Sequence, residues 1–141
     1  MNDVKSCLLV GVGGQGAILI SKIMSNGFMK AGYDVKQSEV HGMAQRGGSV
    51  STQVRWGKKV YGPVFGKGEA DIMVALEKME AVRYAEFLNP NGVAVLLLRD
   101  RLQESPDWEQ AAKKWRIAGQ YAYTASRTQR YLYALTAHGA L

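Results

Sequence analysis

A glycine-rich segment near the start of the chain has the residue types and spacing to bind an anion. Its glycines match the pattern G-x-G-x-x-G, directly after an apolar run and directly before a predicted helix. Bare backbone in such a loop can approach a phosphate, and the N-terminus of the helix favours negative charge. We predict that this segment binds a phosphate-bearing ligand or cofactor through Gly11, Gly13, Gly14, Gln15 and Gly16. The structural alternative is that its glycines only allow close packing of helix against strand.

A second glycine segment, residues 41–49, follows the next predicted strand. In this segment Arg46 is followed by Gly47 and Gly48. The guanidinium and the glycine backbone N–H groups can bind a phosphate, a carboxylate or an acidic group of a partner. His41 has no orienting carboxylate nearby in sequence, which favours a positioning or interface role over acid–base catalysis. The alternative is a flexible link between strands. The residues predicted to face a partner or ligand are His41, Gln45, Arg46, Gly47, Gly48 and Ser49.

The order of predicted elements indicates how the two segments are positioned. An apolar strand at 7–10, a helix from Ala17 to Phe28 ended by Gly32, and a strand at 33–39 form a βαβ unit. The broad apolar face of that helix includes Leu19 and Ile23. If the two strands are parallel, both glycine segments face one crevice.

The middle of the chain continues the α/β pattern. We predict a half-exposed strand at 49–56, a hairpin through 57–61, a buried strand at 72–76, a helix at 77–88 with an apolar face of Met79, Val82 and Phe87, a turn at 89–92 and a strand at 92–98. The predicted fold class is α/β, a Rossmann-like, mostly parallel sheet with flanking helices and an inserted hairpin.

Composition argues against several classes of function. The net charge of +6 is spread along the chain without a basic, aromatic-rich cluster, so we expect no nucleic-acid partner. The alternative is a non-catalytic binding module that uses the basic tail, which salt-sensitive binding to nucleic acid would favour. The N-terminus has neither a signal-peptide core nor a membrane span, which predicts a cytoplasmic protein without membrane contact. Cys7 is the only cysteine, so the chain cannot hold an iron–sulfur cluster with its own thiolates. We expect Cys7 to pack in the core, and we predict no metal ligands.

A free-standing dehydrogenase that binds NAD(P) is an open alternative. Glu39 lies near the position where a dinucleotide-binding domain carries its ribose-binding acid. Against this, the extra Gly14 and Gln15 are unusual for a dinucleotide loop, and the chain is too short for a separate substrate domain.

Two motifs together carry a family resemblance: GVGGQG at 11–16 and SEVHGMAQRGGSV at 38–50. They resemble the gamma-type domain of the 2-oxoacid:ferredoxin oxidoreductases, and within it the small subunits of indolepyruvate ferredoxin oxidoreductases. The resemblance runs from about Val4 to Val95 and includes Gly62–Val64 and Glu69–Asp71.

The resemblance implies a subunit that is inactive alone. In such complexes aryl-pyruvates are oxidatively decarboxylated with coenzyme A and oxidised ferredoxin, and the large subunit carries thiamine diphosphate and the iron–sulfur clusters. This chain would then hold no cofactor by itself, and its two glycine segments would shape coenzyme A access or the subunit contact.

The C-terminal part of the chain differs in composition, because it is rich in Arg, Gln, Ala, Tyr and Trp and has no clear apolar strand run. We divide the chain into a gamma-type domain at 1–98 and a divergent, helical tail at 99–141, with a helix start near Ser105. Because the family pattern is lost there, a truncated or frame-shifted C-terminus is our hypothesis for residues 96–141, with a genuine divergent end as the alternative.

Overall fold

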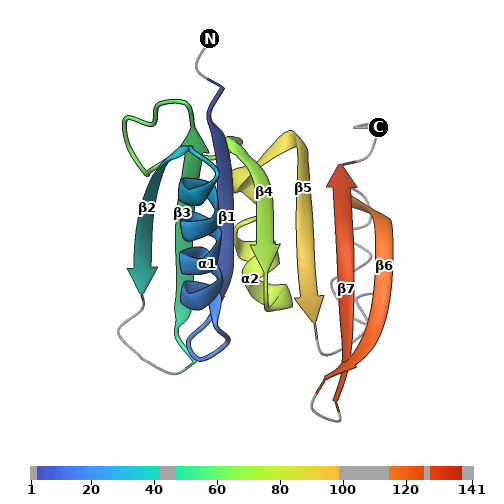
Figure 1. Ribbon diagram of the computed structural model, residues 1–141. Helices are drawn as coiled ribbons and strands as arrows, with labels where there is room; N and C mark the ends of the chain where they lie inside the picture. Colours follow the sequence, from blue (N-terminus) through green and yellow to red (C-terminus); the bar gives the residue numbers. More distant parts are fainter. Residues whose placement is uncertain (1–2, 42–46, 99–114, 126–127, 138–141) are drawn as a thin grey trace.

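The computed structural model describes residues 3–41, 47–98, 115–125 and 128–137. In this part of the chain one seven-stranded sheet has the order β2-β3-β1-β4-β5-β7-β6 (Figure 1). The elements in chain order are β1 (Lys5–Val12), α1 (Ala17–Lys30), β2 (Asp34–His41), β3 (Ser49–Gly57), β4 (Ala70–Ala75), α2 (Lys78–Arg83), the 3-10 turn η1 (Ala85–Phe87), β5 (Leu88–Leu98), β6 (Trp115–Ala125) and β7 (Thr128–Ala137).

The sheet confirms the Rossmann-like α/β class, but it is mixed where a mostly parallel sheet was predicted. β1 pairs in parallel with β4, and β4 with β5. The other pairings are antiparallel. In these pairs β3 lies between β1 and β2, and at the opposite edge of the sheet β7 pairs with β5 and β6 pairs with β7. β1 and β2 still run in the same direction, since both are antiparallel to β3.

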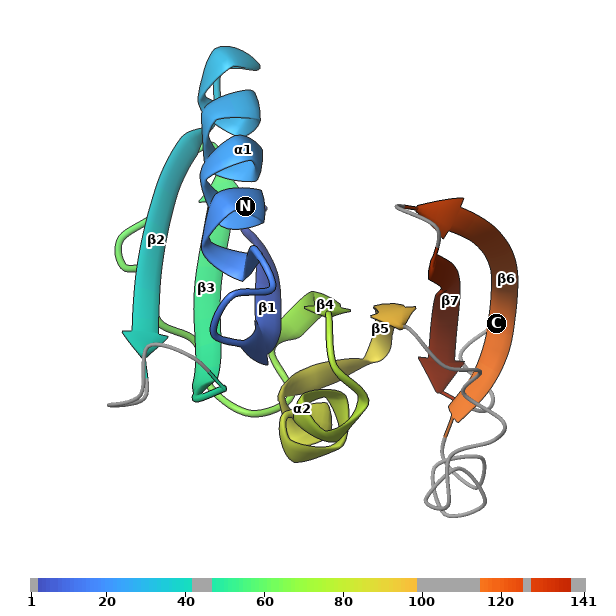
Figure 2. The same ribbon diagram turned by 90° about the horizontal axis from the view of Figure 1, so that it is seen from below.

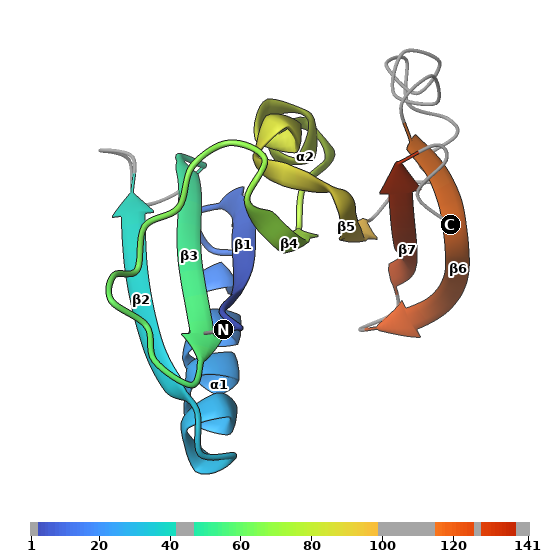
Figure 3. The ribbon, with the colours of Figure 1, turned by 90° about the horizontal axis from the view of Figure 1, so that it is seen from above.

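The two helices cover opposite faces of the sheet (Figures 2 and 3). Alternate residues of β1 therefore enter two cores: Cys7 and Leu9 pack with Ile20 and Met24 of α1, whereas Leu8 and Val10 share a cluster with Ala81 of α2. The crossover that leaves β1 and the one that leaves β4 pass on opposite faces. Adjacent parallel strands with diverging crossovers are where open α/β sheets leave a binding crevice.

Helix α1 buries a narrower face than its sequence predicted. Its buried residues are small, namely Ala17, Ser21 and Ser25, whereas Leu19 and Ile23 are more than half exposed. The small side chains let α1 lie close to the sheet. As predicted, the helix is followed by Gly32 in the left-handed conformation, at φ +94°.

The predicted half-exposed face of β3 is covered, and the predicted hairpin at 57–61 is absent. Residues 58–69 instead cross that face without forming a strand. The Gln53 side chain accepts a hydrogen bond from the Phe65 amide at 3.1 Å, and the Arg55 guanidinium donates to the Gly62 carbonyl at 3.3 Å. Polar residues of β3 therefore bind this crossing segment where solvent was expected.

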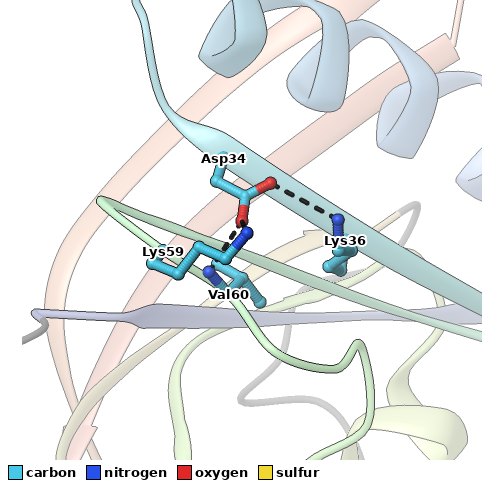
Figure 4. Close-up of polar contacts among 4 residues, drawn as sticks. All are labelled: Asp34, Lys36, Lys59 and Val60. Carbon is cyan, nitrogen blue, oxygen red and sulfur yellow. Dashed lines mark hydrogen bonds and ion pairs between the residues drawn. The ribbon is translucent and has the colours of Figure 1, made fainter.

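Asp34 fixes the start of the crossing segment. Its carboxylate accepts a hydrogen bond from the Val60 amide at 2.8 Å, and the ammonium groups of Lys36 and Lys59 lie 3.4 and 4.0 Å from its oxygens (Figure 4). The backbone hydrogen bond from Val60, followed by the two lysines, lowers the pKa of Asp34. This contact lies at the end of β3 near Gly57, away from the glycine segments.

The predicted buried strand, second helix and following strand correspond to β4, a shorter α2 with η1, and β5. The predicted turn at 89–92 forms an irregularity inside β5, where pairing with β4 jumps from Ala70–Leu88 to Ile72–Val93. Gly92 is required there, because an added Cβ would lie 2.9 Å from the carbonyl oxygens of Ala70 and Asp71.

The prediction of a helical tail was wrong for residues 115–125 and 128–137. They form β6 and β7, and β7 pairs with β5 in the same sheet. The predicted helix start at Ser105 lies outside the described residues. The division of the chain after Leu98 stays a hypothesis, and so does a truncated or frame-shifted C-terminus at residues 96–141. No helix in the described ranges is both long and apolar enough to cross a bilayer.

Candidate functional site

The first glycine segment forms the turn between β1 and α1. Gly14 and Gly16 have φ values of +92° and +91°, with open space where a side chain would project. The Gln15 side-chain oxygen accepts a hydrogen bond from the Val12 amide at 2.9 Å. No side chain caps α1, and its first turn contains no acidic residue. The helix N-terminus therefore keeps its partial positive charge for an external anion.

Gly11 has a different role from the other residues of this segment. It is buried, and an added Cβ would lie 2.8 Å from the Gln15 amide oxygen and 3.4 Å from Leu76 Cβ. Gly11 therefore provides room for Gln15 to brace the turn. Gly13, half-buried, and Gly14, Gln15 and Gly16, exposed, form the accessible part of the segment.

The second glycine segment contacts the first directly. The Gly13 amide donates a hydrogen bond to the Gly48 carbonyl at 2.9 Å, which confirms that both segments lie at one end of the sheet. Gly47 has a φ of +76°, and Ser49 begins β3. His41 ends β2 opposite Val50 and is described in its backbone alone. Gln45 and Arg46 lie outside the described residues.

The start of α2 forms the third part of this site. The loop after β4 reaches the same end of the sheet, where the Leu76 amide donates to the Val10 carbonyl at 3.0 Å. The Ser49 hydroxyl donates to a carboxylate oxygen of Glu80 at 2.6 Å. Glu80 is only 4% exposed, and its amide donates to the Glu77 carboxylate that caps α2.

Glu80 was not predicted as a site residue from the sequence, and the predicted apolar face of α2 was wrong. Met79 and Val82 are about half exposed, whereas Glu80 and Ala81 are buried. The only local signal is the spacing of Glu77 and Glu80, which resembles a capping box. Burial of Glu80 depends on Ser49, which is distant in sequence.

The strand order disfavours the dinucleotide alternative. In a dinucleotide-binding domain the strand with the ribose-binding acid lies next to β1. Here β3 separates β2 from β1, so Glu39 lies opposite Thr52 and one strand further from the glycine loop. The Glu39 carboxylate also accepts a hydrogen bond from the side-chain Nε2 of Gln37 at 2.7 Å. This geometry does not reproduce the ribose-binding position.

Other polar features of the described residues lie away from this end of the sheet. Cys7 is fully buried, and burial raises the pKa of its thiol to about 12, which confirms the predicted core role. The described ranges contain no group of three or more potential metal-ligating side chains. A shallow groove between α1 and β2 is lined by Lys22, Ser25, Asn26, Met29, Val35 and Gln37.

The arrangement is suited to binding. It combines a helix N-terminus, exposed glycine backbone and two mutually bonded loops, which together favour an anion. Within the described part of the site, the polar side chains are Gln15, Ser49, Glu77 and Glu80, and these hold backbone or one another. These side chains can therefore fix the loops whose backbone would contact a ligand.

The fold and site define a Rossmann-like α/β domain with two glycine-rich segments at one end of its sheet. A family model described as "Pyruvate ferredoxin/flavodoxin oxidoreductase" matches residues 6–136, and the chain belongs to this family. The match extends well past Val95, where the sequence resemblance was expected to end.

Individual relatives agree with this assignment. The chain is 52% identical over 92 residues to the indolepyruvate oxidoreductase subunit IorB of Archaeoglobus fulgidus, covering 65% of this chain and 45% of the relative. It is 53% identical over 86 residues to the IorB subunit of Methanothermobacter thermautotrophicus, covering 61% of this chain and 43% of the relative. The chain thus spans less than half the length of these curated relatives.

A solved structure shares the fold. It is the gamma subunit of a keto/oxoacid ferredoxin oxidoreductase from Geobacter sulfurreducens, with a TM-score of 0.54, 26% identity, and coverage of 67% of this chain and 50% of that chain. The sequence resemblance to the gamma-type family is therefore confirmed.

Proposed function

We propose that this chain is the small subunit of a 2-oxoacid:ferredoxin oxidoreductase that acts on aryl-pyruvates such as indolepyruvate. The complex would convert the 2-oxoacid, coenzyme A and oxidised ferredoxin into an acyl-coenzyme A, carbon dioxide and reduced ferredoxin. The relatives named indolepyruvate oxidoreductase subunits support this substrate class.

The contact between Gly13 and Gly48 is the observation that carries the proposal. It joins two glycine segments into one anion-binding surface at the end of β1. The proposed ligand is the phosphate-rich part of coenzyme A, which the backbone N–H groups and the α1 N-terminus would hold. The remainder of the surface would be completed by a partner subunit.

The redox chemistry belongs to the partner in this proposal. A large subunit would supply thiamine diphosphate and the iron–sulfur clusters, and ferredoxin would accept the electrons. The donor set of this chain fits that division, because its single thiol is buried in the core and a cluster needs several accessible thiolates. We place the hetero-oligomeric complex in the cytoplasm.

Co-expression with a large thiamine-diphosphate subunit from the same genome tests the proposal. We expect the two chains to co-purify and to reduce ferredoxin in the presence of both indolepyruvate and coenzyme A, with neither chain active alone. Tight binding of NAD(H) or NADP(H) by the isolated chain, or no association with the large subunit, would contradict it.

Arg46 provides a second test at a residue outside the described ranges. If its guanidinium faces coenzyme A or the subunit contact, Arg46→Ala should raise the KM for coenzyme A or weaken assembly. An intact complex with unchanged kinetics would remove Arg46 from the proposed site.

A further inference from the structure

The buried carboxylate of Glu80 contacts the last residue of the second glycine segment, Ser49. Glu80 is 4% exposed, one of its oxygens accepts the 2.6 Å hydrogen bond from the Ser49 hydroxyl, and the other lies 3.7 Å from Nε of Arg83. Burial of a carboxylate is costly unless hydrogen bonds compensate for the lost water. The Ser49 hydroxyl is therefore held firmly at one position.

Ser49 connects this carboxylate to both glycine segments. It directly follows Gly48, whose carbonyl accepts the hydrogen bond from the Gly13 amide. On the other side, Glu80 is fixed by helix α2, where its own amide donates to the Glu77 cap at 2.8 Å. A continuous series of contacts thus runs from α2 through Ser49 and Gly48 to the first glycine segment.

We propose that Glu80 is a positioning residue that acts on the ligand site through Ser49. Its carboxylate holds the end of the second glycine segment so that Gly48 stays bonded to Gly13. The two segments then present their backbone N–H groups to one anionic ligand. The inference rests on the proposed function in one respect, which is that this ligand is coenzyme A.

Three variants separate the hydrogen bond from other properties of these side chains. Ser49→Ala removes the donor, Ser49→Thr retains a hydroxyl, and Glu80→Gln retains an acceptor but removes the charge. Glu86→Gln is the matched control, because it makes the same chemical change at a carboxylate whose side chain is 69% exposed and pairs with Lys67.

Steady-state kinetics of the assembled complex give the first readout. We expect Ser49→Ala to raise the KM for coenzyme A about tenfold, the factor expected for loss of one charged hydrogen bond, with kcat within about twofold of wild type. Ser49→Thr should restore most of the affinity, Glu80→Gln should have an intermediate effect, and Glu86→Gln should behave as wild type. An unchanged KM in both Ser49→Ala and Glu80→Gln would overturn the proposal.

Amide hydrogen exchange of the full chain gives a readout that does not depend on activity. The Gly13 amide should exchange faster in Ser49→Ala than in wild type, because its acceptor carbonyl is no longer held. Unchanged Gly13 exchange would contradict the positioning role of Glu80. In contrast, a wild-type complex whose activity does not depend on coenzyme A would contradict the proposed function, so the two failures are distinguishable.

Discussion

The two glycine segments lie side by side, but they are held in different ways. The first is braced by its own residues, since Gln15 bonds the Val12 amide and Gly14 and Gly16 adopt left-handed backbone conformations. The second depends on residues from elsewhere, because Gly48 bonds Gly13 and Ser49 bonds Glu80. Local sequence therefore specifies one half of the site, and the assembled fold specifies the other.

Loss of Glu80 should have the largest effect on stability. Glu80→Ala leaves the Ser49 hydroxyl without its acceptor and empties buried space, so we expect a loss of about 2–4 kcal/mol in the free energy of unfolding. Glu80→Gln should lose less than half of this. Urea denaturation measures both values. Wild-type stability in Glu80→Ala would mean that the second segment is also held locally.

A side chain at Gly14 or Gly16 should have the next largest effect. An alanine at either position must adopt a positive φ, which costs about 1–2 kcal/mol. Gly27, inside α1 with open space around it, is the matched control, because Gly27→Ala should stabilise the protein by about 0.5–1 kcal/mol. Thermal or urea unfolding of the three variants distinguishes the opposite signs. Stabilisation by Gly14→Ala would contradict the described turn.

The Gln15 amide should make a smaller contribution. Gln15→Ala removes an exposed hydrogen bond to Val12, so we expect a loss of about 0.5–1.5 kcal/mol. Gln15→Glu, which retains an acceptor oxygen, should recover most of it. A larger loss in Gln15→Ala than in Glu80→Ala would reverse the contrast between the two segments.

Asp34 provides a comparison at the opposite end of the sheet. Its folded pKa is lowered by the Val60 amide and the nearby lysines, so its charged form contributes stability above the unfolded pKa, and that stability is lost as the pH falls through the folded pKa. The stability difference between wild type and Asp34→Asn should therefore shrink in acid below about pH 4, near the ordinary aspartate pKa. Denaturation across a pH series measures it, and a constant difference would contradict the contact.

Asp34→Asn should also leave the KM for coenzyme A unchanged, because Asp34 holds the crossing segment at 58–69 and contacts neither glycine segment. A raised KM in Asp34→Asn would mean that the site responds to general loss of stability.

The same contrast explains what the sequence could predict. Apolar runs and glycine positions predicted β1, α1 and the first segment, because these depend on local pattern. The strand order was not predictable in this way, since β3 enters between β1 and β2 through long-range pairing. Met79 and Val82 suggested an apolar face for α2, yet the helix buries Glu80 because Ser49 bonds it. The strands β6 and β7 also lacked a clear local signal, and β7 is placed by its pairing with β5.

The central claim is that the two glycine segments form one ligand site. Amide hydrogen exchange of the assembled complex, with and without coenzyme A, tests it most directly. The claim predicts that coenzyme A slows exchange in both segments together, at 13–16 and at 47–49, with the half-protecting concentration equal in the two. Protection of one segment alone, or of neither, would contradict it.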